Sequence, residues 1–266
     1  MKKELSELDC TAGELLLIDK PYGWSSFAVV AQIKKWTKAK IGHAGTLDPL
    51  ASGLVICCTG KWTKKLTALI GCKKEYTGII YLGASTPTYD RESLPENQQD
   101  ISALSLEKIN ATTALFTGDI LQYPPIHSAI KQEGKPIYEL ARKGEEVIVK
   151  SRAVTIETFD ITKIALPEVH FRVVCSSGTY IRSLAHDFGA ALGCGGYLHT
   201  LRRTQIGDYR IEDAYTIEEM ASYFGSQMNA RIVVPKGEFS FCHFNVIFRN
   251  ANKGALFLGL LLSFKI

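Results

Sequence analysis

The chain has 266 residues, of which 46% are hydrophobic and 22% charged, as in a globular protein with one large core or two smaller ones. A net charge of +4 permits an acidic partner without requiring one. The first ten residues lack the apolar core of a signal peptide, and the longest apolar stretch, 255–264, is too short to span a bilayer. We therefore expect a cytoplasmic protein with no membrane association.

The N-terminal part is predicted to form a buried strand at 13–18, a turn at 19–26 and a helix of about ten residues, capped by Ser25 or Ser26. A second buried strand at 54–58, a short helix ending at residue 70 and a strand at 76–82 follow.

Residues 42–54 contain three glycines and one proline, which predict a structured loop in front of the second strand. The loop holds one carboxylate, Asp48, and one imidazole, His43. A lone aspartate on such a loop, beside a rigid strand, suits a reacting group. The alternative is a plain turn, which these residues alone favour because Asp-Pro is common in turns.

Lysines cluster at 34–40, 61–65 and 73–74, on three segments that flank this loop. The aromatic residues among them are Trp36, Trp62 and Tyr76. Cations mixed with ring faces are typical of proteins that bind looped or single-stranded nucleic acid. Solvated helix ends and core aromatics are the alternative interpretation.

The seven cysteines are odd in number and show no C-x-x-C spacing. Several lie in apolar runs, where cysteine behaves as a small hydrophobic residue. We therefore predict reduced thiols, with neither a disulfide framework nor a zinc site.

The second half is predicted to contain an exposed loop at 83–100, a helix at 104–117, an irregular proline-rich insert at 118–134, a short helix at 136–144, and antiparallel strands at 147–149, 154–161 and 169–174. A Ser/Gly turn within 175–183 leads into another helix, and a basic strand follows residue 196. The buried face of that helix is predicted to consist of Ile181, Leu184, Ala185, Phe188 and Leu192. The last apolar stretch, 255–264, is predicted to be a strand or helix packed on the body.

Arg182 falls at the start of this helix, where the helix dipole disfavours a cation. A nearby carboxylate would offset this. Asp187 is the partner in a purely structural interpretation, and Asp48 is the partner in a functional one.

Six motifs resemble, in order, those of the TruB family of tRNA pseudouridine synthases. Leu17–Pro21, with Gly23 and Ser25–Ser26, resembles the family's first motif. Residues 42–54 resemble its catalytic motif, GHTGTLDPLATGLL. The other matching segments are Lys74–Tyr76, Gln122–Pro125 with Ser128–Lys131 and Ala141–Gly144, 175–184, and 196–204.

The resemblance implies an α+β fold, with a mixed, largely antiparallel central sheet, flanking helices and a catalytic cleft. The implied catalytic domain is 1–224, including an insert at about 118–150. The tail, 225–266, shows no convincing match to the RNA-binding PUA domain of many relatives, and is short for an independent domain.

The implied activity is isomerisation of uridine 55 in the T-loop of tRNA to pseudouridine, without cofactor or metal. The implied partner is the T-arm stem-loop of tRNA, with no obligatory protein partner, and we expect a monomer. By motif match, the catalytic residues are Asp48, Tyr76 and Arg182. The implied substrate-binding residues are Lys20, His43, Tyr180 and Leu201. The expected RNA-binding residues are Lys64, Lys65, Lys74, Arg142, Arg202 and Arg203.

Three positions depart from the family pattern. Thr86-Pro87-Thr88 stands where relatives often have T-D-T, although Asp90 follows. His127 replaces an aromatic residue of the insert, and Ala44 replaces a frequent threonine. None of these changes removes a reacting group, so they bear on loop detail and substrate affinity.

Three other functions compete with this one. A non-catalytic RNA-binding protein would not need Asp48, Tyr76 and Arg182 together. A guided, dyskerin-like rRNA-modifying enzyme usually carries a full PUA domain and needs partner proteins. A glycoside hydrolase normally needs two facing carboxylates, whereas the motif core holds one.

Overall fold

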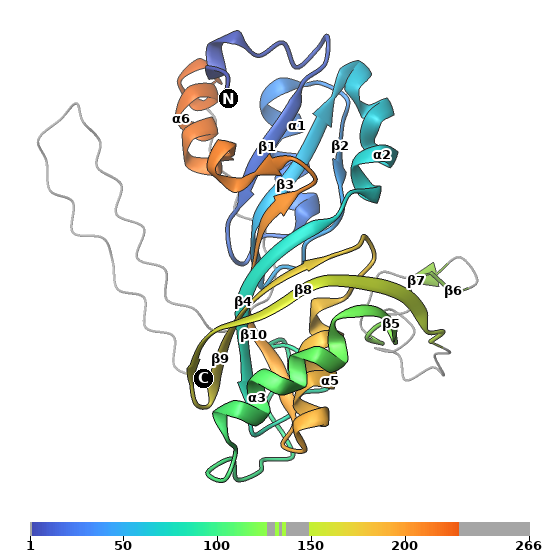
Figure 1. Ribbon diagram of the computed structural model, residues 1–266. Coiled ribbons are helices and arrows are strands. Elements are labelled where there is room, and N and C mark those ends of the chain that lie inside the picture. The colour runs from blue at the N-terminus through green and yellow to red at the C-terminus, as the bar shows by residue number, and fades with distance from the viewer. Residues whose placement is uncertain (1, 127–130, 133–134, 137–148, 229–266) are drawn as a thin grey trace, which may run out of the picture. The chain divides into compact units, whose positions relative to one another are not determined.

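The computed structural model of the chain describes residues 2–126, 131–132, 135–136 and 149–228. Most of its strands join one mixed sheet (Figure 1). These strands are β1 (Leu15–Lys20), β2 (Ile41–Ala44), β3 (Ala51–Thr59), β4 (Lys74–Leu82), β5 (Gly118–Gln122), β8 (Arg152–Ala165), β9 (Glu168–Cys175), β10 (Gly196–Ile206), β11 (Tyr209–Arg210) and β12 (Tyr215–Thr216). The remaining two, β6 (Lys131–Gln132) and β7 (Lys135–Pro136), pair with each other.

The main order across the sheet is β12-β1-β3-β10-β4-β9-β8-β5, with β2 paired to β3 and β11 paired to β10. Two pairs, β1–β12 and β3–β10, are parallel, and the others are antiparallel. The predicted mixed, largely antiparallel α+β fold is therefore confirmed.

Helices gather at both ends of this sheet (Figure 1). The α-helices are α1 (Ser26–Thr37), α2 (Leu66–Gly71), α3 (Leu106–Thr112), α5 (Ile181–Leu192) and α6 (Ile217–Met228). The 3₁₀ helices are η1 (Leu5–Glu7), η2 (Gly60–Lys65), η3 (Thr113–Phe116) and η4 (Ile211–Asp213). The α1, α2 and α6 helices contact the β1–β2 region, whereas α3 and α5 pack near β8 and β10. In the part of the chain described, no helix is both long and apolar enough to cross a bilayer.

Two predicted helices follow directly from local sequence. Ser25 caps α1 by accepting a hydrogen bond from Ala28 N at 3.0 Å, as predicted. The predicted apolar face of α5 is buried along its whole length and packs into the main core.

The parallel contact of β3 with β10 positions the loop of Asp48. Gly53 lies opposite Arg203 in this pairing and has φ +105°. A Cβ atom built at Gly53 would lie 2.3 Å from the Arg203 carbonyl oxygen. Glycine is therefore required where the two backbones approach.

Several predictions need correction. The loop predicted at 42–54 is shorter, because its ends extend β2 and β3, which pair antiparallel with Ala44 opposite Ile56. The segment 83–100 is not wholly exposed, since Thr86, Thr88 and Asp90 are buried. The insert predicted to be irregular begins as a regular strand, β5, which pairs with β8.

The helix predicted at 104–117 is shorter, at Leu106–Thr112, and continues as η3. The helix predicted at 136–144 and the tail segment 255–264 lie outside the described residues, as does most of the strand predicted at 147–149. The domain limits and the part played by the tail stay predictions.

Candidate active site

Asp48 lies on the short loop between β2 and β3, and side chains from three distant segments hold the backbone of this loop. Lys20 Nζ, from β1, lies 3.4 Å from the Pro49 carbonyl oxygen. Ser26 Oγ, from α1, donates to the Leu47 carbonyl at 3.0 Å and accepts from Leu47 N at 2.8 Å. These bonds fix the loop while leaving 42% of the Asp48 side chain exposed.

Arg203 completes this support from β10. Its Nη2 donates to the Gly45 carbonyl at 3.1 Å, and its Nε donates to the Leu54 carbonyl at 2.7 Å. The guanidinium is buried, and the two bonds tie both ends of the Asp48 loop to the centre of the sheet.

Lys20 is fully buried beside the same loop. Its ammonium donates to the carbonyls of Trp24 at 2.6 Å and of Pro21 at 3.1 Å. Burial lowers the pKa of Lys20 to about 8, and the negative charge of Asp48 opposes this shift. Lys20 is therefore protonated at neutral pH and acts on the site through the loop.

Arg182 connects Asp48 to a second carboxylate, Asp90. Its Nε lies 2.9 Å from Asp48 Oδ2 and 3.7 Å from Asp90 Oδ2, and its Nη1 donates to the Thr88 carbonyl at 3.2 Å. The predicted contact between Arg182 and Asp48 is therefore present. An arginine at this position, at the start of α5, orients the Asp48 carboxylate.

Asp90 was not among the predicted site residues. Burial raises the pKa of its carboxyl, whereas Arg182 and a 2.7 Å hydrogen bond from Thr88 Oγ1 lower it. The sequence feature that could have indicated Asp90 is Thr86-Pro87-Thr88, where relatives often have T-D-T and where Asp90 follows two residues later.

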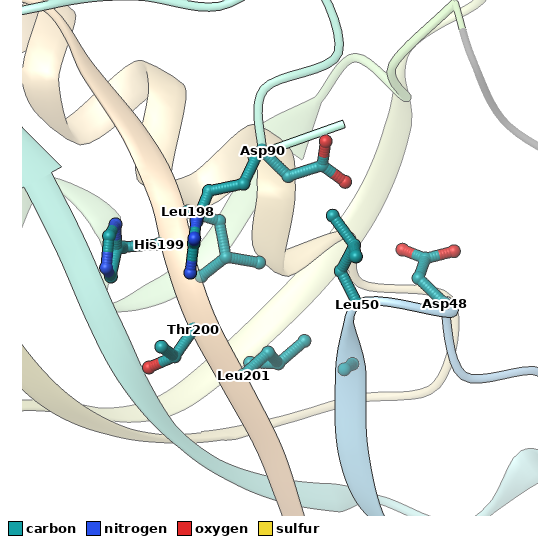
Figure 2. A pocket seen from close by; sticks show the side chains of 9 residues that line it. Asp48, Leu50, Asp90, Leu198, His199, Thr200 and Leu201 are labelled. Atoms are coloured by element: carbon teal, nitrogen blue, oxygen red, sulfur yellow. The ribbon is translucent and has the colours of Figure 1, made fainter. Parts of the chain in front are cut away.

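Asp48 and Asp90 line one pocket, with Leu50 and Leu201 on its apolar wall (Figure 2). The remaining lining residues are Ala51, Arg91, Leu198, His199 and Thr200. Leu201 is placed there because β10 pairs with β3 so that Leu201 lies opposite Ala51. The pocket thus combines one accessible carboxylate with apolar walls.

The two predicted site tyrosines lie on separate elements. Tyr76 is 8% exposed on β4, opposite Arg203 in the sheet, and burial raises the pKa of its hydroxyl. Tyr180 caps α5, and its backbone N–H and carbonyl both bond the Gln122 side chain, at 2.8 and 3.0 Å. The Arg152 guanidinium lies 5.3 Å from the ring centre of Tyr180.

His43 lies in β2, at the other end of the Asp48 loop. Its Nε2 is 3.3 Å from Thr46 Oγ1. Burial and the nearby charge of Arg203 lower the pKa of His43, so the ring is neutral at pH 7.

The predicted RNA-binding residues fall into different environments. Lys64 and Lys65 are exposed in η2, and Lys65 Nζ lies 3.9 Å from the ring centre of Trp62. Arg202 is partly exposed, with a two-point ion pair to Asp19 at 2.7 and 3.1 Å. Arg142 lies outside the described residues.

Lys74 and Arg203 are buried in this structure, which gives their predicted contact with RNA phosphates no support, and that contact stays a prediction. Both are buried, and Lys74 Nζ donates to the carbonyls of Ile70 and Cys72 at 2.5 and 2.6 Å. Trp36 is likewise a core residue, stacked on Phe224 with ring centres 5.9 Å apart. Within the predicted basic and aromatic surface, Lys74 and Trp36 are thus buried residues.

Residues 2–126, 131–132, 135–136 and 149–228 contain no cluster of His, Cys, Asp and Glu side chains suited to a metal ion. Within the same ranges, Cys10, Cys57, Cys58, Cys72, Cys175 and Cys194 are free thiols.

Comparison with known proteins gives consistent matches along the chain. Residues 33–181 match the family model described as "TruB family pseudouridylate synthase (N terminal domain)". Residues 182–233 match the model described as "tRNA pseudouridylate synthase B C-terminal domain".

Two similar relatives are named tRNA pseudouridine synthase B. The protein from Flavobacterium johnsoniae is 53% identical over 213 residues, which cover 77% of this chain and 93% of the relative. The protein from Chloroherpeton thalassium is 48% identical over 217 residues, covering 79% of this chain and 90% of the relative.

Solved structures with a similar fold include a Cbf5-Nop10-Gar1 complex, in which the matching chain is 30% identical with a TM-score of 0.62. That match covers 84% of this chain and 58% of the other. A second is an H/ACA RNP bound to a substrate RNA containing 2′-deoxyuridine, at 28% identity and a TM-score of 0.60, covering 83% of this chain and 56% of the other. This chain thus spans just over half of either protein.

Proposed function

The chain belongs to the TruB family of pseudouridylate synthases, and from this premise we propose that it isomerises uridine 55 in the T-loop of tRNA to pseudouridine. The observation that carries the proposal is the pocket in which Asp48, accessible to a substrate, is paired with the buried Arg182. The name shared by the two bacterial relatives supports tRNA as the substrate.

The reaction begins with removal of the uridine from the T-loop stack, because Asp48 can reach the nucleotide only after its base has left the stack. Flipping costs a few kcal/mol, and stacking on an aromatic ring returns about 1–3 kcal/mol. We assign the stacking to Tyr76, which lies on β4, the strand paired with β10 of Leu201. Leu201 lines the pocket, whereas Tyr180 would contact the flipped nucleotide and His43 would lie against the disrupted stack.

Asp48 then acts as the nucleophile. An ionised carboxylate can form a covalent intermediate at C1′ of the sugar or C6 of the base, or can assist a glycal route. In each route the N1–C1′ bond breaks, the base turns and a C5–C1′ bond forms. C5 loses its proton and N1 gains one, so the isomerisation needs neither oxidant nor cofactor.

Arg182 and the apolar wall have different parts in this reaction. Arg182 orients the Asp48 carboxylate through the ion pair between its Nε and Asp48 Oδ2 at 2.9 Å. Leu50 and Leu201 retain the detached base and limit the entry of water. Lys20 supports the loop from its buried side.

We further propose that Lys64, Lys65 and Arg202 contact the phosphates of the T-arm. Lys64 and Lys65 are exposed, while Arg202 would reach RNA from its pair with Asp19. Arg142, although outside the described residues, stays a candidate on its motif. We expect the protein to work as a cytoplasmic monomer, without a protein partner.

Tritium release from a T-arm stem-loop with 5-tritiated uridine tests the proposal, because C5 loses its hydrogen during the isomerisation. Wild-type protein should release tritium. Asp48→Asn should abolish release and leave binding near normal, since phosphate contacts dominate affinity. If wild type binds full-length unmodified tRNA but releases no tritium, the protein is an RNA-binding protein and the proposed activity is wrong.

A further inference from the structure

Arg91 is a cation at the catalytic pocket to which the mechanism above gives no task. It follows Asp90 in the chain and lines the same pocket as Asp48. Figure 2 shows the carboxylates of Asp48 and Asp90 at this pocket. The Arg91 side chain is exposed. Within the part of the chain that the structure describes, no hydrogen bond or ion pair joins it to another residue. The other arginines near the centre of the sheet, Arg182, Arg202 and Arg203, each have partners.

The backbone that carries Arg91 is firmly held. Asp90 Oδ1 accepts from Glu92 N at 2.9 Å, and Tyr89 accepts at its carbonyl from Leu198 N, also at 2.9 Å. Asp90 also forms a β-bridge with Leu198 of β10. The guanidinium therefore extends from a fixed point beside the pocket.

The charges around the pocket explain why the exposed cation of Arg91 would favour RNA binding. Asp48 and Asp90 carry two negative charges when ionised, and Arg182 supplies one positive charge. Lys20 supplies a second positive charge behind the loop, but Lys20 and Arg182 are both buried. An RNA strand that delivers a uridine to Asp48 brings the negative charge of its phosphates to the solvent side of the pocket. His199, also in the pocket lining, is a poor source of positive charge, because burial and the charge of Arg91 both lower its pKa.

We propose that Arg91 binds a backbone phosphate next to the flipped uridine and thereby holds the nucleotide in the pocket. A guanidinium suits this task because its planar donors can bind two phosphate oxygens at once. This inference rests on the proposed function and adds a substrate-binding residue to it. Arg91 does not act on the reacting bonds, so its effect should fall on binding.

The first test measures binding of the T-arm stem-loop by fluorescence anisotropy across a series of salt concentrations. Arg91→Ala should weaken binding about tenfold at low salt and reduce the slope of log K against log salt by about 0.7–0.9, the share of one phosphate. Arg91→Lys should keep the slope and recover part of the affinity. Arg210→Ala is the control, because Arg210 is exposed on β11 and does not line the pocket.

The second test locates the phosphate. Stem-loops with one neutral methylphosphonate, either 5′ or 3′ of the target uridine, should bind wild type more weakly at one of the two positions. At that position, Arg91→Ala should add no further loss. Fully additive losses at both positions, or an unchanged salt slope, would overturn the proposal.

Tritium release separates this inference from the proposed function. Arg91→Ala should raise KM about tenfold and change kcat less than about twofold. If wild type releases no tritium, the proposed activity fails while the binding results still test Arg91. If wild type is active and Arg91→Ala matches Arg210→Ala, the phosphate contact alone is wrong.

Discussion

Replacement of Gly53 by alanine tests how closely β3 must approach β10. The new Cβ would lie 2.3 Å from the carbonyl oxygen and 2.7 Å from the nitrogen of Arg203. Both are backbone atoms, so relief requires a shift of the strand. A non-glycine residue at φ +105° costs about 1–3 kcal/mol, and loss of one or two strand hydrogen bonds costs about 1 kcal/mol each. We therefore expect a loss of about 2–5 kcal/mol in the free energy of unfolding.

Thermal unfolding followed by circular dichroism would measure this loss. A lowering of Tm by about 2–4 °C per kcal/mol predicts a fall of about 4–20 °C. The matched control is Gly225→Ala in α6, where a Cβ meets nothing within 4 Å and a gain of up to about 1 kcal/mol is expected. If Gly53→Ala unfolds within 1 °C of wild type, the close approach of the two strands is wrong.

Three further predictions concern single side chains. Asp90→Asn should lower kcat in the tritium-release assay by about 10–100-fold, because Arg182 loses one of its two carboxylates; an unchanged kcat would make Asp90 purely structural. Lys64→Ala should reduce the salt dependence of T-arm binding if this exposed lysine meets a phosphate, and an unchanged slope would contradict the contact. Between pH 8 and 10, the free energy of unfolding of wild type should rise relative to that of Lys20→Met. The folded chain releases the Lys20 proton near pH 8, whereas the unfolded chain keeps it up to a pKa near 10.5, so a rising pH favours the folded state. Denaturant titrations at several pH values measure this difference, and a fall would reverse the sign we assign.

Local sequence was sufficient for the elements whose signals are local. The cap at Ser25 and the apolar repeat of α5 involve residues within three or four positions of one another, so both helices were predicted correctly. The family resemblance added the contact between Asp48 and Arg182, which the pattern of residues left open between Asp48 and Asp187.

Asp90 was missed because its place in the site depends on contacts between distant segments. The loop that carries it packs against the start of α5, where the bond between Arg182 and the Thr88 carbonyl joins residues 94 positions apart. Amino-acid composition does not predict which distant segments pack together, and residues 83–100 have the composition of an ordinary polar loop.

The burial of Lys74 and Arg203 could have been predicted from the sequence. Residues two apart in a strand share a face, so Lys74 shares the buried face of Tyr76, and Arg203 shares that of Leu201. Arg202 points to the opposite face and is partly exposed. Strand alternation, applied to charged residues as well as apolar ones, therefore distinguishes the buried Lys74 and Arg203 from the partly exposed Arg202.

The attachment of the Asp48 loop to three distant segments also has a consequence for the growing chain. Lys20 and Ser26 are made before the loop, but Arg203 is added more than 150 residues after Gly45, the residue whose carbonyl it holds. While residues 196–206 are still inside the ribosome, β3 lacks its parallel neighbour and the loop lacks one of its supports. The emerging N-terminal half therefore exposes a catalytic sequence without a formed catalytic site, and chemistry on RNA begins only when synthesis of the sheet is nearly complete.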